Sequence, residues 1–350
     1  MARRPFRIET ERLTIRMLAR EDVTAFVHYR KLPAVYQYQD WPVPYTRDLA
    51  HELTDEMEVA HGPTPGRWVQ LAIDAGDGLV GDVAVFLDDA GTFATIGFTI
   101  DPRHQGHGYA VEAAAGVIGW LFRRRRVHRI AATIDPRNVA SARVLEACGF
   151  EYVGTARSAA FQRGEWTDDA RFSLLEADWK DWQRRPTGPP RTVRLVEVTD
   201  ANLRTVSRLD RGFSQRDFVA PVSISLAQAL IPPIDDGAPL QPWYRAVEAD
   251  GEIVGFVMLA EPAGRQPHPY LWRLLIDRRH QRRGIGERVV LDIARRRREA
   301  GATHLDVSYV PLPAVGSPEP FYRRLGFVPT GEIDDGEVEA RLDLTTIDLR

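Results

Sequence analysis

The chain has 350 residues, of which 44% are apolar and 27% charged, with a formal net charge of −3. Because a domain usually takes about 100–200 residues, this length predicts two domains. The near-neutral charge disfavours a protein built to bind nucleic acid or an anionic membrane, and no apolar run reaches the ~18 residues of a membrane-spanning helix. One cysteine, Cys148, excludes an internal disulfide framework and a cysteine-rich zinc site. The N-terminus lacks an apolar signal core, so we expect a cytoplasmic protein.

Both halves of the chain show the same order of predicted elements. In the first half the pattern predicts strands at Leu13–Leu18, Trp68–Ile73, Val80–Leu87 and Ala94–Ile100, and a helix at Tyr109–Phe122. In the second half it predicts strands at Val193–Val198, Tyr244–Glu248, Ile253–Leu259 and Tyr270–Ile276, and a helix at Glu287–Arg298. Turns rich in Asp and Gly join the two middle strands of each half into hairpins. We therefore predict a mixed α/β fold in each half, with a mostly antiparallel sheet flanked by helices.

A proline-rich segment, Pro186–Pro190, separates the halves. Three prolines and one glycine in these five residues cannot continue the helical stretch that precedes them. We place an N-terminal domain at residues 1–185, a linker at 186–190 and a C-terminal domain at 191–350.

A glycine motif between a predicted strand and a predicted helix occurs once in each half. Arg103-His-Gln-Gly-His-Gly108 recurs as Gln281-Arg-Arg-Gly-Ile-Gly286, which sets Gly106 against Gly284, 178 residues later. A second landmark, Cys148-Gly-Phe150, recurs as Leu325-Gly-Phe327 at an offset of 177 residues. Two landmarks that keep nearly the same spacing indicate an internal duplication.

Such a loop is suited to bind a phosphate group. Glycines let the backbone come close to a ligand, and the start of a helix offers unpaired N–H groups and the positive end of the helix dipole. A single copy would more often be a plain tight turn, whereas two copies favour binding. The candidate contacts are Arg103, His104, Gln105, Gly106, His107, Gly108 and Tyr109 in the first half and Gln281, Arg282, Arg283, Gly284, Ile285 and Gly286 in the second.

With these motifs the sequence resembles the GNAT N-acetyltransferases, in two tandem copies over nearly the whole chain. The signature of that superfamily, Gln/Arg-x-x-Gly-x-Gly/Ala, holds the pyrophosphate of acetyl-CoA. The resemblance assigns it to Arg103-x-x-Gly106-x-Gly108 and to Gln281-x-x-Gly284-x-Gly286. The first half resembles the RimJ/RimL-type ribosomal-protein N-terminal acetyltransferases in Thr10–Leu18, Gln105–Ala113 and Asn138–Phe150. The second half resembles the bacterial spermine/spermidine acetyltransferases in Phe218–Pro221, Leu271–Asp277 and Phe321–Phe327.

The resemblance implies roles for individual residues. In the first half the family's asparagine and serine, which face the thiol arm of the cofactor, correspond to Asn138 and Ser141, while the family's strand glutamate is replaced by Thr95. In the second half the family's tyrosine, a general acid, corresponds to Tyr322, and the first half has Leu145 at that place. The second half departs from its family at two further places. Val315 and Pro318 stand opposite Asn138 and Ser141 of the first half. Tyr270 and Leu271 stand where the family has an acidic residue.

Acetyl transfer from a thioester to an amine needs a polarised carbonyl, a neutral amine and a proton for the leaving thiolate. Backbone N–H groups of Thr99 and Ile100, or of Leu275 and Ile276, are expected to polarise the carbonyl. Tyr322 is expected to protonate the sulfur, which leucine cannot do. The base stays open among Asp82, Asp210, Glu261 and Glu337, whereas Glu112 is expected to be structural.

We therefore expect an acetyl-CoA-dependent N-acetyltransferase that uses no metal. It would move an acetyl group to a primary amine of a small molecule, a peptide or a protein N-terminus, by direct attack on the thioester. We expect no nucleic-acid or membrane partner, and either a monomer with two paired domains or a homodimer. The alternative is a CoA-binding sensor or scaffold protein in which one or both halves are catalytically silent. Because it keeps Tyr322, the second half is expected to be the better-equipped catalyst.

Overall fold

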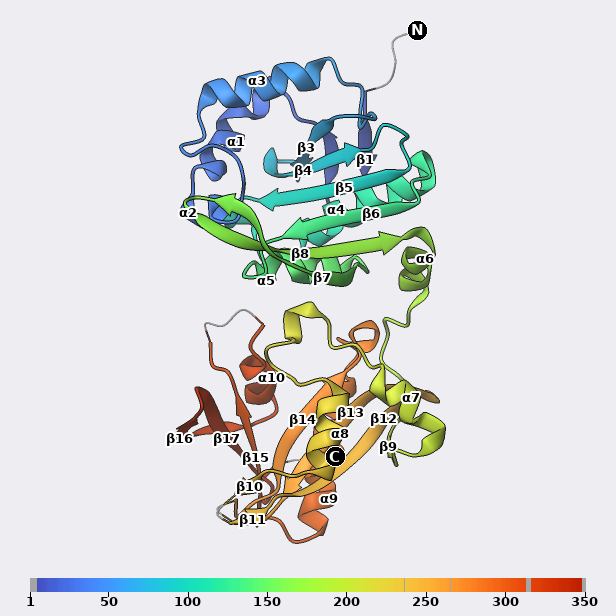
Figure 1. Ribbon diagram of the computed structural model, residues 1–350, viewed down its shortest axis with the longest axis vertical. Helices are drawn as coiled ribbons and strands as arrows, with labels where there is room; N and C mark the ends of the chain where they lie inside the picture. Colours follow the sequence, from blue (N-terminus) through green and yellow to red (C-terminus); the bar gives the residue numbers. More distant parts are fainter. Residues whose placement is uncertain (1–4, 236, 265, 313–315, 348–350) are drawn as a thin grey trace. The chain divides into compact units, whose positions relative to one another are not determined.

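The structure is a computed structural model that describes residues 5–235, 237–264, 266–312 and 316–347. The chain divides into two compact units, Met1–Arg184 and Arg185–Arg350, each with its own main sheet (Figure 1). Both sheets are mixed, mostly antiparallel and flanked by helices, which confirms the predicted fold class. Within the described ranges, no helix combines the length and the apolar character that a bilayer crossing requires.

The first domain is built on eight strands in the order β1-β2-β3-β4-β5-β6-β8-β7. The strands are β1 Arg7–Glu9, β2 Thr14–Met17, β3 Trp68–Asp74, β4 Leu79–Leu87, β5 Phe93–Ile100, β6 Arg129–Ile134, β7 Glu151–Gln162 and β8 Glu165–Leu175. The α-helices are α1 Val23–Arg30, α2 Pro33–Tyr36, α3 Arg47–Glu58, α4 Tyr109–Trp120, α5 Val139–Ala147 and α6 Glu176–Arg184. The pairing of β5 with β6 is parallel, and the other pairings in this sheet are antiparallel.

Helices α1 and α4 cover opposite faces of this sheet. Asp82 on β4 reaches Arg30 on α1, with 2.8 Å between the charged atoms. The register places Ile15 of β2 on the other face, where a Cβ added to Gly116 of α4 would lie 3.3 Å from it. The face that carries Asp82 also carries Thr99, its cross-strand neighbour on β5.

The second domain has seven main strands in the order β16-β17-β15-β14-β13-β12-β9. The strands are β9 Val193–Val196, β12 Gln241–Ala249, β13 Glu252–Glu261, β14 Tyr270–Ile276, β15 His304–Tyr309, β16 Val328–Asp334 and β17 Glu337–Asp343, and a small separate hairpin pairs β10 Ile234–Asp235 with β11 Ala238–Pro239. The α-helices are α7 Asp200–Ser207, α8 Val222–Leu230, α9 Ile285–Glu299 and α10 Glu319–Arg324. Again one pairing, β14 with β15, is parallel.

Two apolar cores lie on the two faces of the second sheet. Under α9 and α10 the core includes Val289, Val307 and Tyr322. Under α7 and α8 it includes Val206, Val222 and Phe256. The two faces of the sheet are therefore covered by different helices, as in the first domain.

The observed helices differ in detail from those predicted. Helix α4 ends at Trp120 and continues as one π-helical turn, Leu121–Arg125, which ends at Arg126 with a left-handed φ of 56°. Helix α9 begins at Ile285, two residues before the predicted start, directly after Gly284. Both α4 and α9 thus start immediately after a glycine of the predicted loop.

Candidate functional site

In each domain the two parallel strands separate before they reach the glycine loop. Strand β5 pairs with β6 only from Phe93 to Thr95, and β14 pairs with β15 only at Tyr270. Their later residues, up to Ile100 and Ile276, pair only with β4 or β13 on the opposite edge. A gap flanked by backbone polar groups therefore opens at the end of each of these strands.

The direction of each backbone N–H group decides which of the four predicted donors to the thioester carbonyl faces the gap. The N–H groups that follow the strands, at Asp101 and Asp277, donate across to β4 and β13 at 3.0 and 2.9 Å. Backbone polar groups point alternately to the two edges of a strand. The groups of Ile100 and Ile276 therefore face the gap, whereas those of Thr99 and Leu275 face the neighbouring strand.

The structure corrects the alignment of the two glycine loops. Gly108 and Gly284 each precede the first helical residue, with left-handed φ values of 81° and 75°. Gln105 and Gln281 each donate through Nε2 to the carbonyl of the last strand residue, at 3.1 and 3.0 Å. Equivalent residues are thus 176 positions apart, and the prediction that matched Gly106 with Gly284 is wrong.

The corrected signature of the first loop is Gln105-x-x-Gly108-x-Ala110. The first loop allowed two alignments because it has two glycines and because both Arg103 and Gln105 fit the first position. Gly106 instead corresponds to Arg282, and both have a left-handed φ, 79° and 59°. Only the helix-capping glycine is therefore common to both loops at this point.

The space beside the loops can accept a phosphate group. A Cβ built on Gly284 would meet no atom within 4 Å beyond its chain neighbours, and one built on Gly108 would meet only Arg12 Nη2, at 3.4 Å. The N–H groups of the first turns, at residues 109–111 and 285–287, lie ahead of the first intrahelical bonds, which Glu112 and Arg288 make to Gly108 and Gly284. Open space and unpaired donors together suit the pyrophosphate of a nucleotide cofactor.

Two arginines that were predicted to contact the phosphates instead pair with groups of the protein itself. Arg103 donates to Asp101 Oδ2 at 2.6 and 3.1 Å. Arg283 is only 6% exposed, and its Nε donates to the carbonyl of Gly188 in the linker at 2.8 Å. Arg282, by contrast, is exposed. The second loop therefore presents Arg282 to solvent, while Arg283 attaches the linker to its own domain.

The histidines near the loops are held by neighbouring side chains. His107 stacks on Tyr109 with 5.6 Å between ring centroids. His280 Nδ1 lies 2.9 Å from Nη1 of Arg283, and burial lowers the His280 pKa, with Asp277 opposing and Arg283 adding to the shift. A neutral ring can accept the hydrogen bond from Arg283. His280 thus supports the residue that holds the linker.

A pair of strand glycines beside the loops was missed by the sequence reasoning. A Cβ on Gly81 of β4 would lie 2.3 Å from the carbonyl oxygen of Thr99, and one on Gly255 of β13 would lie 2.6 Å from that of Leu275. Only glycine permits so close an approach of the strand that leads into the loop. The repeated Val-Gly pairs at residues 80–81 and 254–255 were the available signal.

Asn138 and Ser141 are joined at the start of α5. Asn138 Oδ1 accepts from the Ser141 backbone N–H at 3.1 Å, so this asparagine caps the helix. Both residues are half-buried. Val315, the residue predicted opposite Asn138, lies outside the described residues.

Tyr322 and Leu145 occupy equivalent turns. Phe327 N–H donates to the Tyr322 carbonyl at 3.1 Å, as Phe150 N–H does to that of Leu145 at 3.0 Å. The Tyr322 ring stacks on Tyr309 with 5.9 Å between centroids and an interplanar angle of 12°. Burial, and then the nearby Tyr270 and Glu337, raise the pKa of Tyr322, so the phenol keeps the proton it would donate.

The five acidic residues considered in the sequence have different partners in the structure. Glu112 accepts from Thr10 Oγ1 at 2.6 Å and from the Arg12 backbone N–H at 2.7 Å, so it joins the start of α4 to the N-terminal strands. Three others form ion pairs, which are Asp82–Arg30 at 2.8 Å, Asp210–Arg278 at 2.6 Å and Glu261–Arg297 at 2.7 Å. Glu337 instead accepts a hydrogen bond from the Ser308 hydroxyl.

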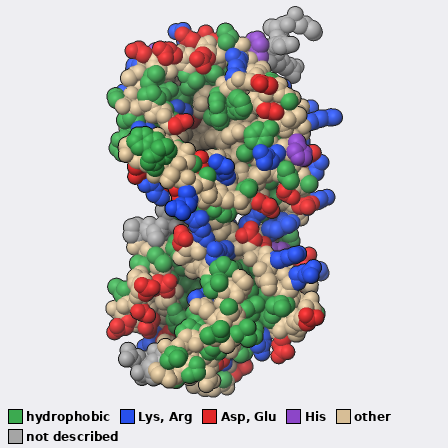
Figure 2. All heavy atoms as spheres, in the orientation of Figure 1, with side chains coloured by type: hydrophobic (Ala, Val, Ile, Leu, Met, Phe, Trp, Pro, Cys, Tyr) green, Lys and Arg blue, Asp and Glu red, His purple; other side chains and the backbone are tan. Residues whose placement is uncertain are grey.

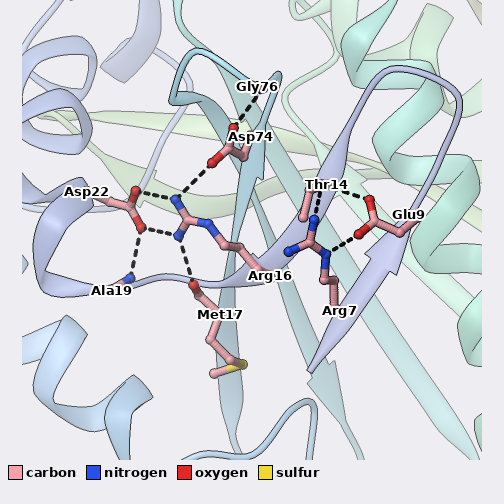
Figure 3. Close-up of polar contacts among 9 residues, drawn as sticks. All are labelled: Arg7, Glu9, Thr14, Arg16, Met17, Ala19, Asp22, Asp74 and Gly76. Carbon is pink, nitrogen blue, oxygen red and sulfur yellow. Dashed lines mark hydrogen bonds and ion pairs between the residues drawn. The ribbon is translucent and has the colours of Figure 1, made fainter. Parts of the chain in front are cut away.

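A cavity of about 1180 Å³ adjoins the first glycine loop on the α1 face. It is lined by Arg103 and His104 from the loop, by α1, and by Arg16. Figure 3 shows Arg16 donating to both carboxylate oxygens of Asp22, at 2.7 and 2.8 Å, and to Asp74 at 3.2 Å. These bonds fix the cavity wall between β2, β3 and the segment before α1.

Charges of both signs share the surface. On the face drawn in Figure 2, basic and acidic side chains are interspersed over each domain. The two tetra-arginine runs fall at helix ends, with Arg123–Arg125 in the π-turn that follows α4 and Arg295–Arg298 in the last turns of α9. Cations at these ends complement the helix dipoles.

Comparison with known proteins gives matches in both domains. Residues 12–151 match the model of a GNAT acetyltransferase domain, and residues 213–327 match that of the acetyltransferase (GNAT) family. The probable N-acetyltransferase YjcK of Bacillus subtilis is 38% identical over 104 residues, which is 29% of this chain and 58% of that protein. The [ribosomal protein uS5]-alanine N-acetyltransferase of Escherichia coli is 33% identical over 84 residues, which is 24% of this chain and 43% of that protein. The chain thus spans about half the length of these relatives.

One solved structure is similar to part of the chain. The spermidine N-acetyltransferase from Vibrio cholerae, solved in complex with CoA and spermine, is 20% identical, with a TM-score of 0.43, and the match covers 48% of this chain and 98% of that one. The two family matches fall one in each domain, each across a strand–glycine loop–helix unit. The chain belongs to the GNAT acetyltransferases and carries two domains of that family in tandem.

Proposed function

We propose that the protein is an acetyl-CoA-dependent N-acetyltransferase of the cytoplasm that acetylates a primary amine on a small molecule, a peptide or a protein N-terminus. The observation that carries the proposal is the duplicated arrangement of parted strands, capping glycine and open helix start. Acetyl transfer to an amine is the general reaction of the family. The resemblance of the second half to polyamine acetyltransferases makes a polyamine the first amine to try.

The binding of acetyl-CoA is assigned to the corrected loops. In the first domain Gly108 and the N–H groups that follow it would hold the pyrophosphate, and in the second domain Gly284 would do so, with Arg282 supplying positive charge. The backbone N–H of Ile100 or Ile276, which faces the gap between the strands, would donate to the thioester carbonyl. A donor fixed in advance at a developing oxyanion is among the largest contributions to such reactions.

The second domain is proposed as the better catalyst. When the amine attacks, the C–N bond forms and the C–S bond breaks, and the thiolate needs a proton. Tyr322 has that proton, because its pKa is raised by burial, whereas Leu145 at the equivalent turn has none to give. The first domain would depend on Ser141 or water for this step.

A second function is supported for the first domain alone. Its loop has the same capping geometry as the second, but its turn offers Leu145 in place of a donor, and Thr95 stands where related enzymes have a glutamate. These differences favour a first domain that binds CoA with little or no turnover. In that case the chain would have one catalytic domain and one CoA-responsive domain.

Thiol release is the experiment that tests the proposal. The full chain is incubated with acetyl-CoA and a panel that contains spermidine, a peptide with an N-terminal alanine and an aminoglycoside, and acetylated products are identified by mass spectrometry. We expect at least one amine to gain one acetyl group. CoA binding without any acetylated product would favour the sensor or scaffold alternative for both domains.

A further inference from the structure

The second domain carries a chain of three hydrogen-bonded side chains beside the gap between β14 and β15. The Tyr270 hydroxyl lies 2.6 Å from Ser308 Oγ, and the Ser308 hydroxyl donates to Glu337 Oε2. The three residues come from β14, β15 and β17 and all are partly buried. Tyr270 stands at the last position where β14 and β15 still pair. The hydrogen-bonded chain therefore begins where the gap between β14 and β15 opens.

The directions of these hydrogen bonds follow from counting protons. A serine hydroxyl has one proton, and Ser308 gives it to the carboxylate. Tyr270 must then donate to Ser308, which leaves its oxygen able to accept a proton from a substrate. The chain runs from Tyr270 to Glu337 in the direction that removes a proton from an amine.

The hydrogen-bonded chain of Tyr270, Ser308 and Glu337 lies on the opposite face of the sheet from Tyr322. Val307 and Tyr309 of β15 belong to the core under α9 and α10 that also holds Tyr322. Ser308, between them, must point to the other face, which α7 and α8 cover. An amine that arrives from the α7/α8 face would meet Tyr270, while the sulfur would leave toward Tyr322.

Glu337 differs from the other acidic candidates in its partners. Asp82, Asp210 and Glu261 are each neutralised by an arginine at 2.6–2.8 Å. Within the described part of the chain, Glu337 makes no such ion pair. Two other titratable side chains, Arg273 of β14 and Tyr322 of α10, interact electrostatically with Tyr270 and Glu337 of the hydrogen-bonded chain. On the same face, Asp306, Glu339 and Arg341 are joined to one another, with Arg341 donating to Asp306 at 2.7 and 2.9 Å.

The first domain lacks this hydrogen-bonded chain. Counted through the β-bulge at Met258, the strand registers set Thr95, Thr133 and Asp169 at the positions of Tyr270, Ser308 and Glu337. Among the described residues, no hydrogen bond joins these three side chains. The hydrogen-bonded chain is thus specific to the domain that has Tyr322.

We propose that Glu337, acting through Ser308 and Tyr270, takes the proton from the acceptor amine in the second domain. This inference rests on the proposed acetyltransferase function. A proton passes from the ammonium group to the Tyr270 oxygen, while the Tyr270 proton moves to Ser308 and the Ser308 proton to Glu337. The products of this step are a neutral amine and a neutral carboxyl group. Tyr270 touches the substrate, and Ser308 and Glu337 act through it.

The later steps then balance. The neutral amine forms the C–N bond, the C–S bond breaks, and the thiolate takes the Tyr322 proton. The nitrogen loses its remaining extra proton through solvent, which restores the phenol, and the Glu337 carboxyl group returns its proton to solvent. The net products are the acetylated amine, CoA with a free thiol, and one proton.

The test compares two glutamates on one strand face. Glu339 lies two residues beyond Glu337 on β17 and contacts Arg341 at 3.2 Å. With the full chain and the panel amine of highest turnover, we expect Glu337→Gln to lower kcat at pH 7 about 10²-fold, within the range of general-base catalysis. Glu339→Gln should lower it less than about threefold. Melting temperature and acetyl-CoA affinity are measured for each variant.

The pH profile separates a proton relay from a structural role. The deficit of Glu337→Gln should shrink as the pH approaches the amine's own pKa, about 10 for an alkylamine, because the amine is then neutral without help. Ser308→Ala should reproduce the deficit, and Ser308→Thr, which keeps a hydroxyl, should restore most of the activity. A deficit that stays constant with pH would overturn the relay, as would equal effects of Glu337→Gln and Glu339→Gln.

A Gly284→Val control distinguishes failure of the relay from failure of the proposed function. If the protein acetylates no amine, or if its activity survives Gly284→Val, the assignment of catalysis to the second domain is contradicted. The proton relay is then contradicted as well. Activity that requires Gly284 but not Glu337 contradicts the relay alone.

Discussion

The two domains share the loop geometry and differ in the strands that lead to it. Gly108 and Gly284 have nearly the same backbone conformation, and Gln105 and Gln281 make the same bond to the preceding strand. The hydrogen-bonded Tyr270, Ser308 and Glu337 of the second domain, by contrast, correspond to Thr95, Thr133 and Asp169 in the first, and no hydrogen bond joins these three among the described residues. The duplication therefore keeps the features suited to bind a cofactor and varies the features suited to move protons. A domain can retain the first set after losing the second.

The strongest loss of turnover is expected when Tyr322 is changed. Tyr322→Phe removes the proposed proton donor and should lower kcat about 10²–10⁴-fold, the usual range for general acid–base catalysis. Tyr309→Phe is the matched control, because that ring stacks on Tyr322 and its hydroxyl is buried without a partner among the described residues. Steady-state kinetics with the identified amine measures both variants. Near-wild-type kcat in Tyr322→Phe would return the residue to a packing role.

The next effect concerns the glycines that both domains share. A β-branched residue at φ 75° or 81° is strained by about 1–3 kcal/mol, and its side chain would fill the space left for the phosphates. We expect Gly284→Val and Gly108→Val each to weaken acetyl-CoA binding in one domain by about 10–100-fold, since 1.4 kcal/mol is about tenfold. Calorimetric stoichiometry should fall from two sites to one.

Gly106→Arg is the control for this comparison. The equivalent position in the second loop is Arg282, which already has a left-handed φ of 59°. Binding should therefore survive in Gly106→Arg. If Gly106→Arg abolished a site and Gly108→Val did not, the corrected alignment of the loops would be refuted.

A smaller effect should reveal the glycines beside the loops. Ala at position 81 or 255 would press against a backbone oxygen at 2.3 or 2.6 Å, so we expect each variant to lose about 1–3 kcal/mol of unfolding free energy. Gly97→Ala on β5 is the control, because a Cβ there would meet nothing within 4 Å. Urea denaturation followed by circular dichroism compares the three. Equal stability of Gly81→Ala and Gly97→Ala would contradict the close approach of the strands.

The smallest effect is a pH dependence of the second domain. The pKa of His280 is lowered by burial and further by Arg283, against the opposing effect of Asp277. The unfolded chain therefore binds the proton more readily, and stability that is complete above about pH 6.5 should be lost as the pH falls through the folded pKa. Melting temperatures between about pH 7.5 and 5.5 should fall less in His280→Asn. An unchanged slope would place the titration elsewhere.

The amino-acid sequence alone predicts the duplicated architecture. Strand–glycine–helix units at Ala94–Phe122 and Tyr270–Arg298 are local patterns, because hydrophobic periodicity and the conformational freedom of glycine act over a few residues. The boundary near Pro186 follows from the same local chemistry. The sequence also places Tyr322 at a set distance before Gly326, and its catalytic role stays a prediction. The oligomeric state stays a prediction.

The contacts between distant groups could not be predicted without the three-dimensional fold. The loop register needed the bonds of Gln105 and Gln281, because two glycines in one loop fit the same motif. Glu337 was one of four equal candidates until the sheet placed it on Ser308, 29 residues away, and Ser308 on Tyr270, 38 residues away. Arg283, which the sequence assigned to phosphate, turns to Gly188 in the linker instead, 95 residues away. Contacts across strands depend on register and on the path of the whole chain, which no local pattern records.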